Sequence, residues 1–186
     1  MPVTWVLTKT ATPINEKGTI IIDTITSKTK KTSHGVVAIE KKQRKFKRGV
    51  HVHLFGQNEN GEIISALILK RASDNQFSIV SGKSKPGEKI ETTAYRETSE
   101  ETGLIPSLLH DTDRRITIQC RKYTFYASVF VGLIKHNTMI KLNHEHTKYE
   151  YVPTDISPYR IEITEQQNNQ KFCINKARTM FGSVMS

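Results

Sequence analysis

The chain has 186 residues, 36% of them hydrophobic and 25% charged, and its formal net charge is +10. This composition is typical of a globular protein that is long enough to bury a core without disulfide bonds. No apolar run approaches the roughly 20 residues that span a bilayer, and the first residues lack the pattern of a secretory signal. We therefore expect no membrane partner, and the positive charge favours an anionic ligand.

Two cysteines, Cys120 and Cys173, form no metal-ligand pattern and are too few for a disulfide framework. We expect both to be reduced thiols in a cytoplasmic protein. Much of the positive charge lies in two clusters, within residues 28–31 and 41–48. These clusters are either solvated loops or an electrostatic funnel for a phosphate-rich ligand, and charge alone leaves both interpretations open.

Residues 1–46 are predicted to form a basic, β-rich N-terminal extension. The segments 3–7, 18–26 and 35–40 are rich in β-branched residues, which favours short strands joined by polar turns. The extension is expected to add strands to the main sheet, to contribute to a homodimer, or to cover a substrate. Residues 47–186 are predicted to form the main domain.

The main domain shows the alternation of strands and helices that is typical of a layered α/β fold. Its first strand places His51 and His53 on one face, which we expect to be a solvated sheet face, with the lining of a pocket as the alternative. Gly103 is expected to end the central helix in a left-handed conformation. In chain order, the predicted elements are a hairpin over 50–55 and 63–69, a helix over 90–102, strands over 115–121 and 123–134, and a helix over 167–181.

Three glutamates of the central helix share one face, because Glu97, Glu100 and Glu101 are spaced i, i+3 and i+4. Like charges at this spacing destabilise a helix by roughly 0.2–0.5 kcal/mol per pair. A hard cation such as Mg²⁺, which prefers carboxylate and phosphate oxygens, would offset that repulsion. Arg96 is a candidate to orient one of the carboxylates. The alternative is a solvated acidic face without a ligand.

The glutamates belong to a longer pattern that resembles the motif of the Nudix hydrolase family, Gly-x5-Glu-x7-Arg-Glu-U-x-Glu-Glu-x-Gly-U, where U is a bulky aliphatic residue. A chance match at all fixed positions has odds on the order of 10⁻⁸ to 10⁻⁹ at average residue frequencies. Leu104 fits the second aliphatic position, whereas Thr98 departs from the first. The fixed positions are all matched here, by Gly82, Glu88, Arg96, Glu97, Glu100, Glu101 and Gly103.

The resemblance extends beyond this motif. Residues 48–55 and 66–71 resemble the opening hairpin of Nudix domains, and residues 144–152 resemble a segment that follows their core strands. The resemblance implies a Nudix α/β/α sandwich with a mixed central sheet, preceded here by the β-rich extension. It also implies a pyrophosphohydrolase that depends on Mg²⁺, with Mn²⁺ as a possible substitute.

The same resemblance implies roles for the motif residues. Glu97, Glu100 and Glu101 are expected to be metal ligands, with the Gly82 carbonyl oxygen as a further ligand. Glu88 is expected either to support the geometry of the loop and helix or to bind a second metal ion. In chemical terms, metal ions neutralise the charge of a diphosphate and lower the pKa of the attacking water.

A carboxylate is also needed to accept the proton of that water. Glu100 and Glu145 are the two candidates for this general base, and the sequence leaves the choice open. The resemblance implies that a glutamate of the downstream segment completes the metal site or acts as the base; Glu145 is the matching position, and Glu150 is a weaker candidate. The cations expected to bind substrate phosphates are Arg71, Lys83 and Lys85.

The resemblance leaves the substrate open. Our first expectation is a nucleoside triphosphate or another small nucleoside diphosphate derivative. The alternative is the 5′ end of an RNA, carrying a triphosphate or a cap, or a dinucleoside polyphosphate. A non-catalytic module that binds nucleotides or RNA is a third reading, which the complete set of motif glutamates disfavours.

Overall fold

The computed structural model describes residues 45–120 and 123–181 and the backbone of four short strand segments before them. Those segments pair antiparallel, Val6–Leu7 (β1) with Thr26–Ser27 (β2) and Lys31–Thr32 (β3) with Gly35–Val36 (β4). Most of the strands predicted within residues 1–46 lie outside the described residues. The domain boundary at residue 46, and the roles proposed for the extension, therefore stay predictions.

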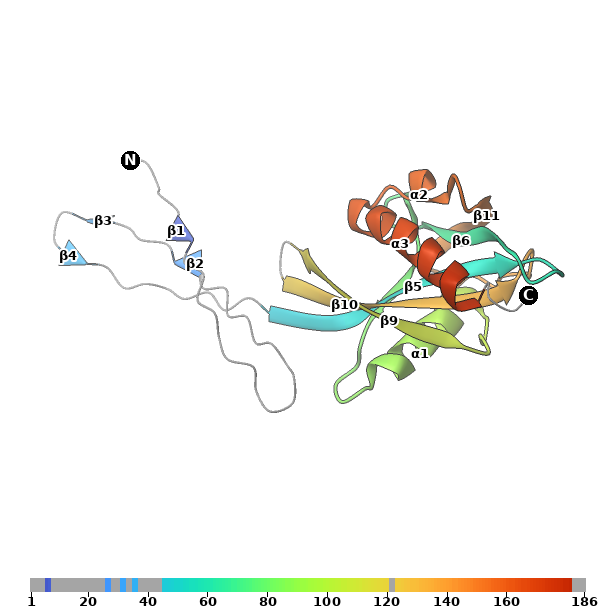
Figure 1. Cartoon of the computed structure of the whole chain (residues 1–186). Coiled ribbons are helices and arrows are strands. Elements are labelled where there is room, and N and C mark those ends of the chain that lie inside the picture. Colours follow the sequence, from blue (N-terminus) through green and yellow to red (C-terminus); the bar gives the residue numbers. More distant parts are fainter. Residues whose placement is uncertain are drawn as a thin grey trace. The chain divides into compact units, whose positions relative to one another are not determined.

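A seven-stranded sheet forms the centre of the main domain (Figure 1). Its main path has the order β11-β6-β5-β10-β9, and two short strands add to it, β7 beside β6 and β8 beside β5. The strands are β5 (Lys45–Gln57), β6 (Ile63–Arg71), β7 (Phe77–Ser78), β8 (Val80–Lys83), β9 (Leu109–Gln119), β10 (Tyr123–Lys135) and β11 (His146–Pro153).

Helices cover both faces of this sheet, as Figure 1 shows. Helix α1 (Ile90–Thr102) lies on one face, and α3 (Thr164–Phe181), with the short α2 (Ser157–Arg160), lies on the other. Ala94 of α1 belongs to one buried apolar cluster, and Cys173 of α3 belongs to another. The predicted α/β sandwich is therefore confirmed.

The expectation that His51 and His53 of the central strand β5 are exposed to solvent is wrong. Val50 and Val52 pack into the apolar cluster that contains α1 residues, as strand alternation requires. His51 and His53 lie on the opposite face, but they are only 2% and 1% exposed, because α3 covers that face. The Nδ1 atom of His53 contacts the Oε1 atom of Gln170 in α3.

The helix that carries the glutamates has the predicted bounds, Ile90–Thr102. Gly103 ends it with a φ of 69°, and its amide donates to the Ser99 carbonyl oxygen over 2.9 Å. Lys89 stands at the helix start without a side-chain cap. Thr98, the departure from the motif, is buried, and its hydroxyl donates to the Ala94 carbonyl oxygen over 2.8 Å.

Other elements differ from the sequence prediction. β9 begins at Leu109 and α3 begins at Thr164, each earlier than expected. β7, β8, β11 and α2 were not expected, since they are short or, in β11, rich in polar residues. Across the described part of the chain, no helix is both long and apolar enough to cross a bilayer.

Candidate active site

Arg96 is the centre of the site on α1. Its Nε donates to Glu88 Oε1 over 2.8 Å, and its Nη2 donates to Glu88 Oε2 over 2.9 Å. Its Nη1 donates to Glu97 over 2.7 Å and to Glu100 over 3.0 Å, and Nη2 also reaches the Lys83 carbonyl oxygen over 2.9 Å. The planar guanidinium therefore joins the loop before α1 to two of the three clustered glutamates.

Glu88 stabilises the loop that leads into α1. Its Oε2 atom accepts from the Lys85 amide over 2.8 Å and lies 3.0 Å from the Thr93 hydroxyl. Hydrogen bonds from Arg96, and then from the Lys85 amide, lower the pKa of the Glu88 carboxyl to about 2. These contacts favour the loop-supporting role among the two that the sequence left open for Glu88.

Gly82 allows a close approach between β8 and α1. A Cβ atom at this position would lie 1.9 Å from the carboxyl carbon of Glu97, so no other residue fits without a shift. The Gly82 carbonyl oxygen points to β5, where it would lie 2.0 Å from a Cβ atom on Gly49. The geometry therefore assigns Gly82 a spacing role and gives no support to its carbonyl oxygen as a metal ligand.

Glu101 is the most deeply placed carboxylate of the site, at 3% exposure. Its Oε2 atom accepts from the Ser81 amide over 3.4 Å and lies 3.8 Å from His146 Nε2. Burial raises the pKa of the Glu101 carboxyl to about 9, and the nearby charges of Glu97 and Glu145 add to this rise. Burial also raises the pKa of Glu97.

The side-chain donors of the site can be compared with the ligands that a divalent cation requires. Within residues 45–120 and 123–181, no three His, Cys, Asp or Glu side chains converge on one point that would hold a metal ion. Arg96 draws Glu97 and Glu100 towards itself, whereas Glu101 turns to a backbone amide. Mg²⁺ commonly takes only one or two carboxylates, with water and phosphate oxygens as its other ligands. The charges of Glu97, Glu145 and Glu100 all raise the pKa of Glu101, so the site offers several carboxylate oxygens, the donor type that a hard cation prefers.

A cavity of about 510 Å³ opens beside Glu101. It brings together three residues predicted from the sequence, Arg71, Glu101 and Glu145. Arg71 is oriented by Asp74, with Nε 3.1 Å from Oδ1, and the Glu145 carbonyl oxygen accepts from the Ala72 amide over 2.8 Å. The lining residues are Arg71, Ala72, Ser73, Ser81, Glu101, His144, Glu145 and His146.

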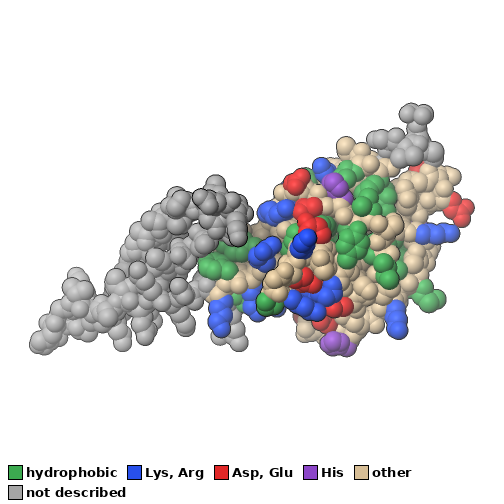
Figure 2. All heavy atoms as spheres, turned by 90° about the horizontal axis from the view of Figure 1, so that it is seen from below, with side chains coloured by type: hydrophobic (Ala, Val, Ile, Leu, Met, Phe, Trp, Pro, Cys, Tyr) green, Lys and Arg blue, Asp and Glu red, His purple; other side chains and the backbone are tan. Residues whose placement is uncertain are grey.

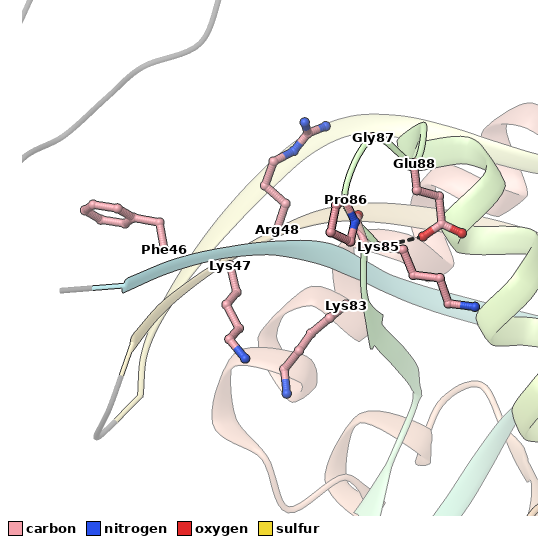
Figure 3. Close-up of a pocket in the computed structure, with 9 residues that line it drawn as sticks. Phe46, Lys47, Arg48, Lys83, Lys85, Pro86, Gly87 and Glu88 are labelled. Carbon is pink, nitrogen blue, oxygen red and sulfur yellow. Dashed lines mark hydrogen bonds between the residues drawn. The ribbon is translucent and has the colours of Figure 1, made fainter.

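A second cavity, of about 490 Å³, lies between the start of β5 and the loop before α1 (Figure 3). Lys83 and Lys85 line it, so the structure separates them from Arg71, with which the sequence grouped them as phosphate binders. Figure 2, seen from the α1 side, shows basic and acidic side chains interspersed on this face. The lining residues are Phe46, Lys47, Arg48, Lys83, Ser84, Lys85, Pro86, Gly87 and Glu88.

Several residues of the site were missed in the sequence. The Thr93 hydroxyl lies 3.0 Å from Ser84 Oγ and 3.0 Å from Glu88 Oε2 in the loop, contacts for which the motif gives no signal. His146 is the immediate neighbour of Glu145, but its position beside Glu101 depends on the pairing of β11 with β6. Ser81 contributes a backbone amide, for which no side-chain pattern gives a signal.

Comparisons with known proteins agree with this geometry. The model of the NUDIX domain matches residues 45–169, which is more than half of the chain. The fold is similar to that of the E. coli dihydroneopterin triphosphate pyrophosphohydrolase, with a TM-score of 0.61 and 20% identity over 71% of this chain and 99% of that one. A C. elegans Ap4A hydrolase is also similar, with a TM-score of 0.60 and 15% identity over 72% and 98% of the two chains.

A MutT protein from Methanosarcina mazei Go1 is a third similar structure, with a TM-score of 0.60 and 19% identity over 74% of this chain and 99% of that one. A search of curated protein sequences finds no match. These low identities show the fold, whereas the family model and the complete motif show the family. The chain therefore belongs to the Nudix family.

Proposed function

We propose that this enzyme hydrolyses a phosphoanhydride bond in a nucleoside triphosphate or another nucleoside diphosphate derivative, with Mg²⁺ as its metal and Mn²⁺ as a substitute. The observation that carries the proposal is the deeply buried Glu101 beside Glu97, Glu100 and Glu145. Arg96 contacts Glu97 and Glu100, but none of its hydrogen bonds among the described residues reaches Glu101, whose charged form therefore needs another positive partner. A metal-bound diphosphate is a ligand that requires such an oxygen-rich site.

The residues of the first cavity have complementary tasks in this reaction. Glu97, Glu100 and Glu101 would hold the metal, which when bound neutralises phosphate charge and activates water. Arg71, oriented by Asp74, presents positive charge to the substrate phosphates in the cavity. The two names among the similar structures that specify a substrate, dihydroneopterin triphosphate and Ap4A, support a phosphate chain as the reacting group.

The cavity also favours one of the two candidates for the general base. Glu145 lines it and is exposed, with its backbone anchored by Ala72 and Asn143. Glu100 is instead engaged by Arg96 over 3.0 Å, which lowers its availability as a proton acceptor. We therefore assign the removal of the water proton to Glu145.

The cellular compartment of the enzyme is inferred from its two thiols. Cys120 and Cys173 are free, and Cys173 is buried in the core. Free thiols are typical of reducing compartments. We infer a cytoplasmic enzyme.

The test is a panel of candidate substrates incubated with the full chain and Mg²⁺, followed by identification of both products. Nucleoside triphosphates, Ap4A, ADP-ribose, nucleotide sugars and capped RNA form the panel, and the product pair defines the bond that is cut. Glu97→Gln and Glu101→Gln are expected to lower kcat/KM by at least about 100-fold, the scale of losing a group that stabilises the transition-state charge. The matched control is Glu91→Gln, an exposed glutamate of the same helix outside the motif.

Two results would contradict the proposal. One is unchanged turnover in the Glu97 and Glu101 variants, which would remove the carboxylates from the chemistry. The other is a folded protein that turns over no member of the panel. Such a protein would be a binding module that has kept the motif without the reaction.

A further inference from the structure

His146 is a buried imidazole in the wall of the first cavity. Its side chain is 4% exposed, and that of Glu101, which lines the same cavity, is 3% exposed. The pairing of β11 with β6 fixes its backbone and places it opposite Arg71, which also lines the cavity. Close packing around a buried side chain leaves it few rotamers, so the ring has a fixed position beside Glu101.

Asn143 determines which nitrogen of the His146 ring carries a hydrogen. Its Oδ1 atom accepts from the Glu145 backbone amide over 3.0 Å, which only the oxygen of a side-chain amide can do. His146 Nδ1 lies 3.3 Å from the same oxygen atom. Because that oxygen can only accept, Nδ1 is the donor of this contact. In a neutral imidazole the other nitrogen, Nε2, then has a free lone pair.

The lone pair of His146 Nε2 meets a second acceptor. Nε2 lies 3.8 Å from Glu101 Oε2, which is too far for a hydrogen bond. When Glu101 is ionised, both atoms carry lone pairs and neither carries a hydrogen. Two such atoms in a buried place need a positive group between them. Two ligand atoms of one ion, each about 2.1 Å from it, lie at most about 4.2 Å apart, so a single cation can contact both.

An imidazole ligand changes the metal preference of a carboxylate site. Mg²⁺ takes oxygen ligands, whereas an imidazole nitrogen favours transition-metal ions. A histidine that binds a metal usually donates its other ring N–H to an oxygen atom, as His146 does to Asn143. Within residues 45–120 and 123–181 no three side chains converge to hold a metal ion, so phosphate and water oxygens would complete the ligands of a cation bound by this pair.

We propose that His146 Nε2 and Glu101 Oε2 together bind a divalent transition-metal cation, and that His146 makes the site selective for such a cation over Mg²⁺. Asn143 is the positioning residue that keeps Nε2 free of hydrogen. This inference rests on the proposed function, in which substrate phosphates supply further ligands. It adds a nitrogen ligand to a motif whose expected ligands are oxygen atoms. Mg²⁺ still binds through the carboxylates, but it gains little from His146.

The first experiment detects the nitrogen ligand directly. The full chain is stripped of metal with EDTA, desalted and given one equivalent of Mn²⁺ at pH 7.5, and pulsed EPR records the modulation from nitrogen nuclei at the ion. Labelling histidine alone with ¹⁵N should change this modulation, because an imidazole nitrogen contacts Mn²⁺. His146→Gln should abolish the histidine signal. His144→Gln, the control at an exposed histidine of the same cavity, should keep it.

The second experiment measures the metal selectivity. Isothermal titration calorimetry gives the Kd of Co²⁺ and of Mg²⁺ in the presence of methylene diphosphonate, a diphosphate that cannot be hydrolysed. His146→Gln should lower the ratio of the Mg²⁺ Kd to the Co²⁺ Kd at least about tenfold, since Co²⁺ gains more from an imidazole. Asn143→Ala should weaken Co²⁺ binding about 10- to 100-fold, the usual cost of losing the partner that supports a ligand. Asn143→Asp should retain it, because a carboxylate oxygen accepts from the same N–H groups.

Three results would refute the inference. They are a modulation that ¹⁵N-histidine leaves unchanged, a histidine signal that His144→Gln removes, and an unchanged ratio of the two Kd values in folded His146→Gln. The labelling uses the wild-type chain, so it decides the question even if His146→Gln does not fold. A wild type that hydrolyses a member of the substrate panel without a histidine signal refutes only this inference. A wild type that shows the signal but turns over no substrate with Mg²⁺ or Co²⁺ refutes only the proposed function.

Discussion

The buried histidines of β5 lead to a quantitative prediction about stability in acid. Burial lowers the pKa of His51 to about 3, and the neighbouring His53 adds to this effect. Burial also lowers the pKa of His53, to about 4, although its hydrogen bond to Gln170 opposes the shift. In the unfolded chain both side chains titrate near 6.5. The unfolded state therefore binds more protons below pH 6.5, and the stability that the neutral histidines provide is lost as the pH falls towards 4.

The magnitude can be worked out for one residue. At pH 5.0 the unfolded pKa lies 1.5 units above the pH, so protonating His51 favours unfolding by about 2 kcal/mol at 1.36 kcal/mol per unit. The same residue contributes almost nothing at pH 7.5, where it is neutral in both states. Since whole proteins are stable by only about 5–15 kcal/mol, this effect is large.

The assay is urea unfolding of the wild type and of His51→Phe at pH 7.5 and 5.0, followed by circular dichroism. Phenylalanine preserves the aromatic shape beside Phe125 and removes the Nδ1 atom, which has no hydrogen-bond partner among the described residues. Glu101 titrates in the opposite sense over this range, so the prediction concerns the difference between the two proteins. Lowering the pH should shift that difference by about 2 kcal/mol in favour of the variant.

An exposed histidine provides the control. His144→Phe removes an exposed imidazole that lines the first cavity, and the change in the free energy of unfolding between pH 7.5 and 5.0 should match that of the wild type. If His51→Phe and wild type lose the same free energy of unfolding between the two pH values, the burial argument for His51 is wrong.

Three further perturbations address the carboxylates to which we assign catalysis. The folded-state pKa of Glu101 is about 9, so the stability that its protonated form provides is complete below about pH 4.5 and is lost as the pH rises through 9. Glu101→Gln should abolish this loss of stability at alkaline pH, which is measured by urea unfolding in EDTA. Gly82→Ala should lower kcat by about 100-fold, the cost of displacing a catalytic group by roughly 1 Å. The reason is that the new Cβ atom would lie 1.9 Å from the Glu97 carboxyl carbon. A variant with wild-type kcat and an intact circular dichroism spectrum would disprove the close approach. Glu145→Gln should lower kcat by about 10²- to 10⁴-fold, the usual contribution of a general base. Glu150→Gln, which removes a carboxylate held by Lys148 and Arg160, should leave kcat unchanged. Equal effects of these two variants on kcat would refute the assignment of Glu145 as the base.

Local spacing explains what the sequence could predict. The shared face of Glu97, Glu100 and Glu101, and the helix end at Gly103, follow from the geometry of one helix. The central strand was harder, because an alternating pattern with polar residues is also typical of a strand with one exposed face. The contact of His53 with Gln170 of α3 shows that this face is covered, and that contact depends on tertiary packing.

The two cavities could not be predicted, because residues far apart in the sequence meet in each. The pairing of β11 with β6 places His146 opposite Arg71, and this brings Glu145 into the same cavity as Arg71. The pairing of β8 with β5 brings Lys83 beside Lys47 in the same way. Strand register fixes both meetings, and a single sequence contains no local signal for register between distant strands.

Arg96 explains how α1 tolerates its clustered glutamates. The guanidinium donates to Glu88, Glu97 and Glu100, so the protein supplies a cation that offsets their repulsion. Folding should therefore not require a divalent metal, and EDTA should leave the circular dichroism spectrum and the free energy of unfolding of the wild type unchanged. Arg96→Gln should lower the free energy of unfolding by about 1.5–3 kcal/mol, the scale of a lost charged hydrogen bond, and Mg²⁺ should restore more stability to this variant than to the wild type. Arg115→Gln, which breaks an exposed ion pair with Asp111, is the control and should change stability by less than about 1 kcal/mol. A wild type that unfolds in EDTA would show that the metal, and not Arg96, neutralises the glutamates.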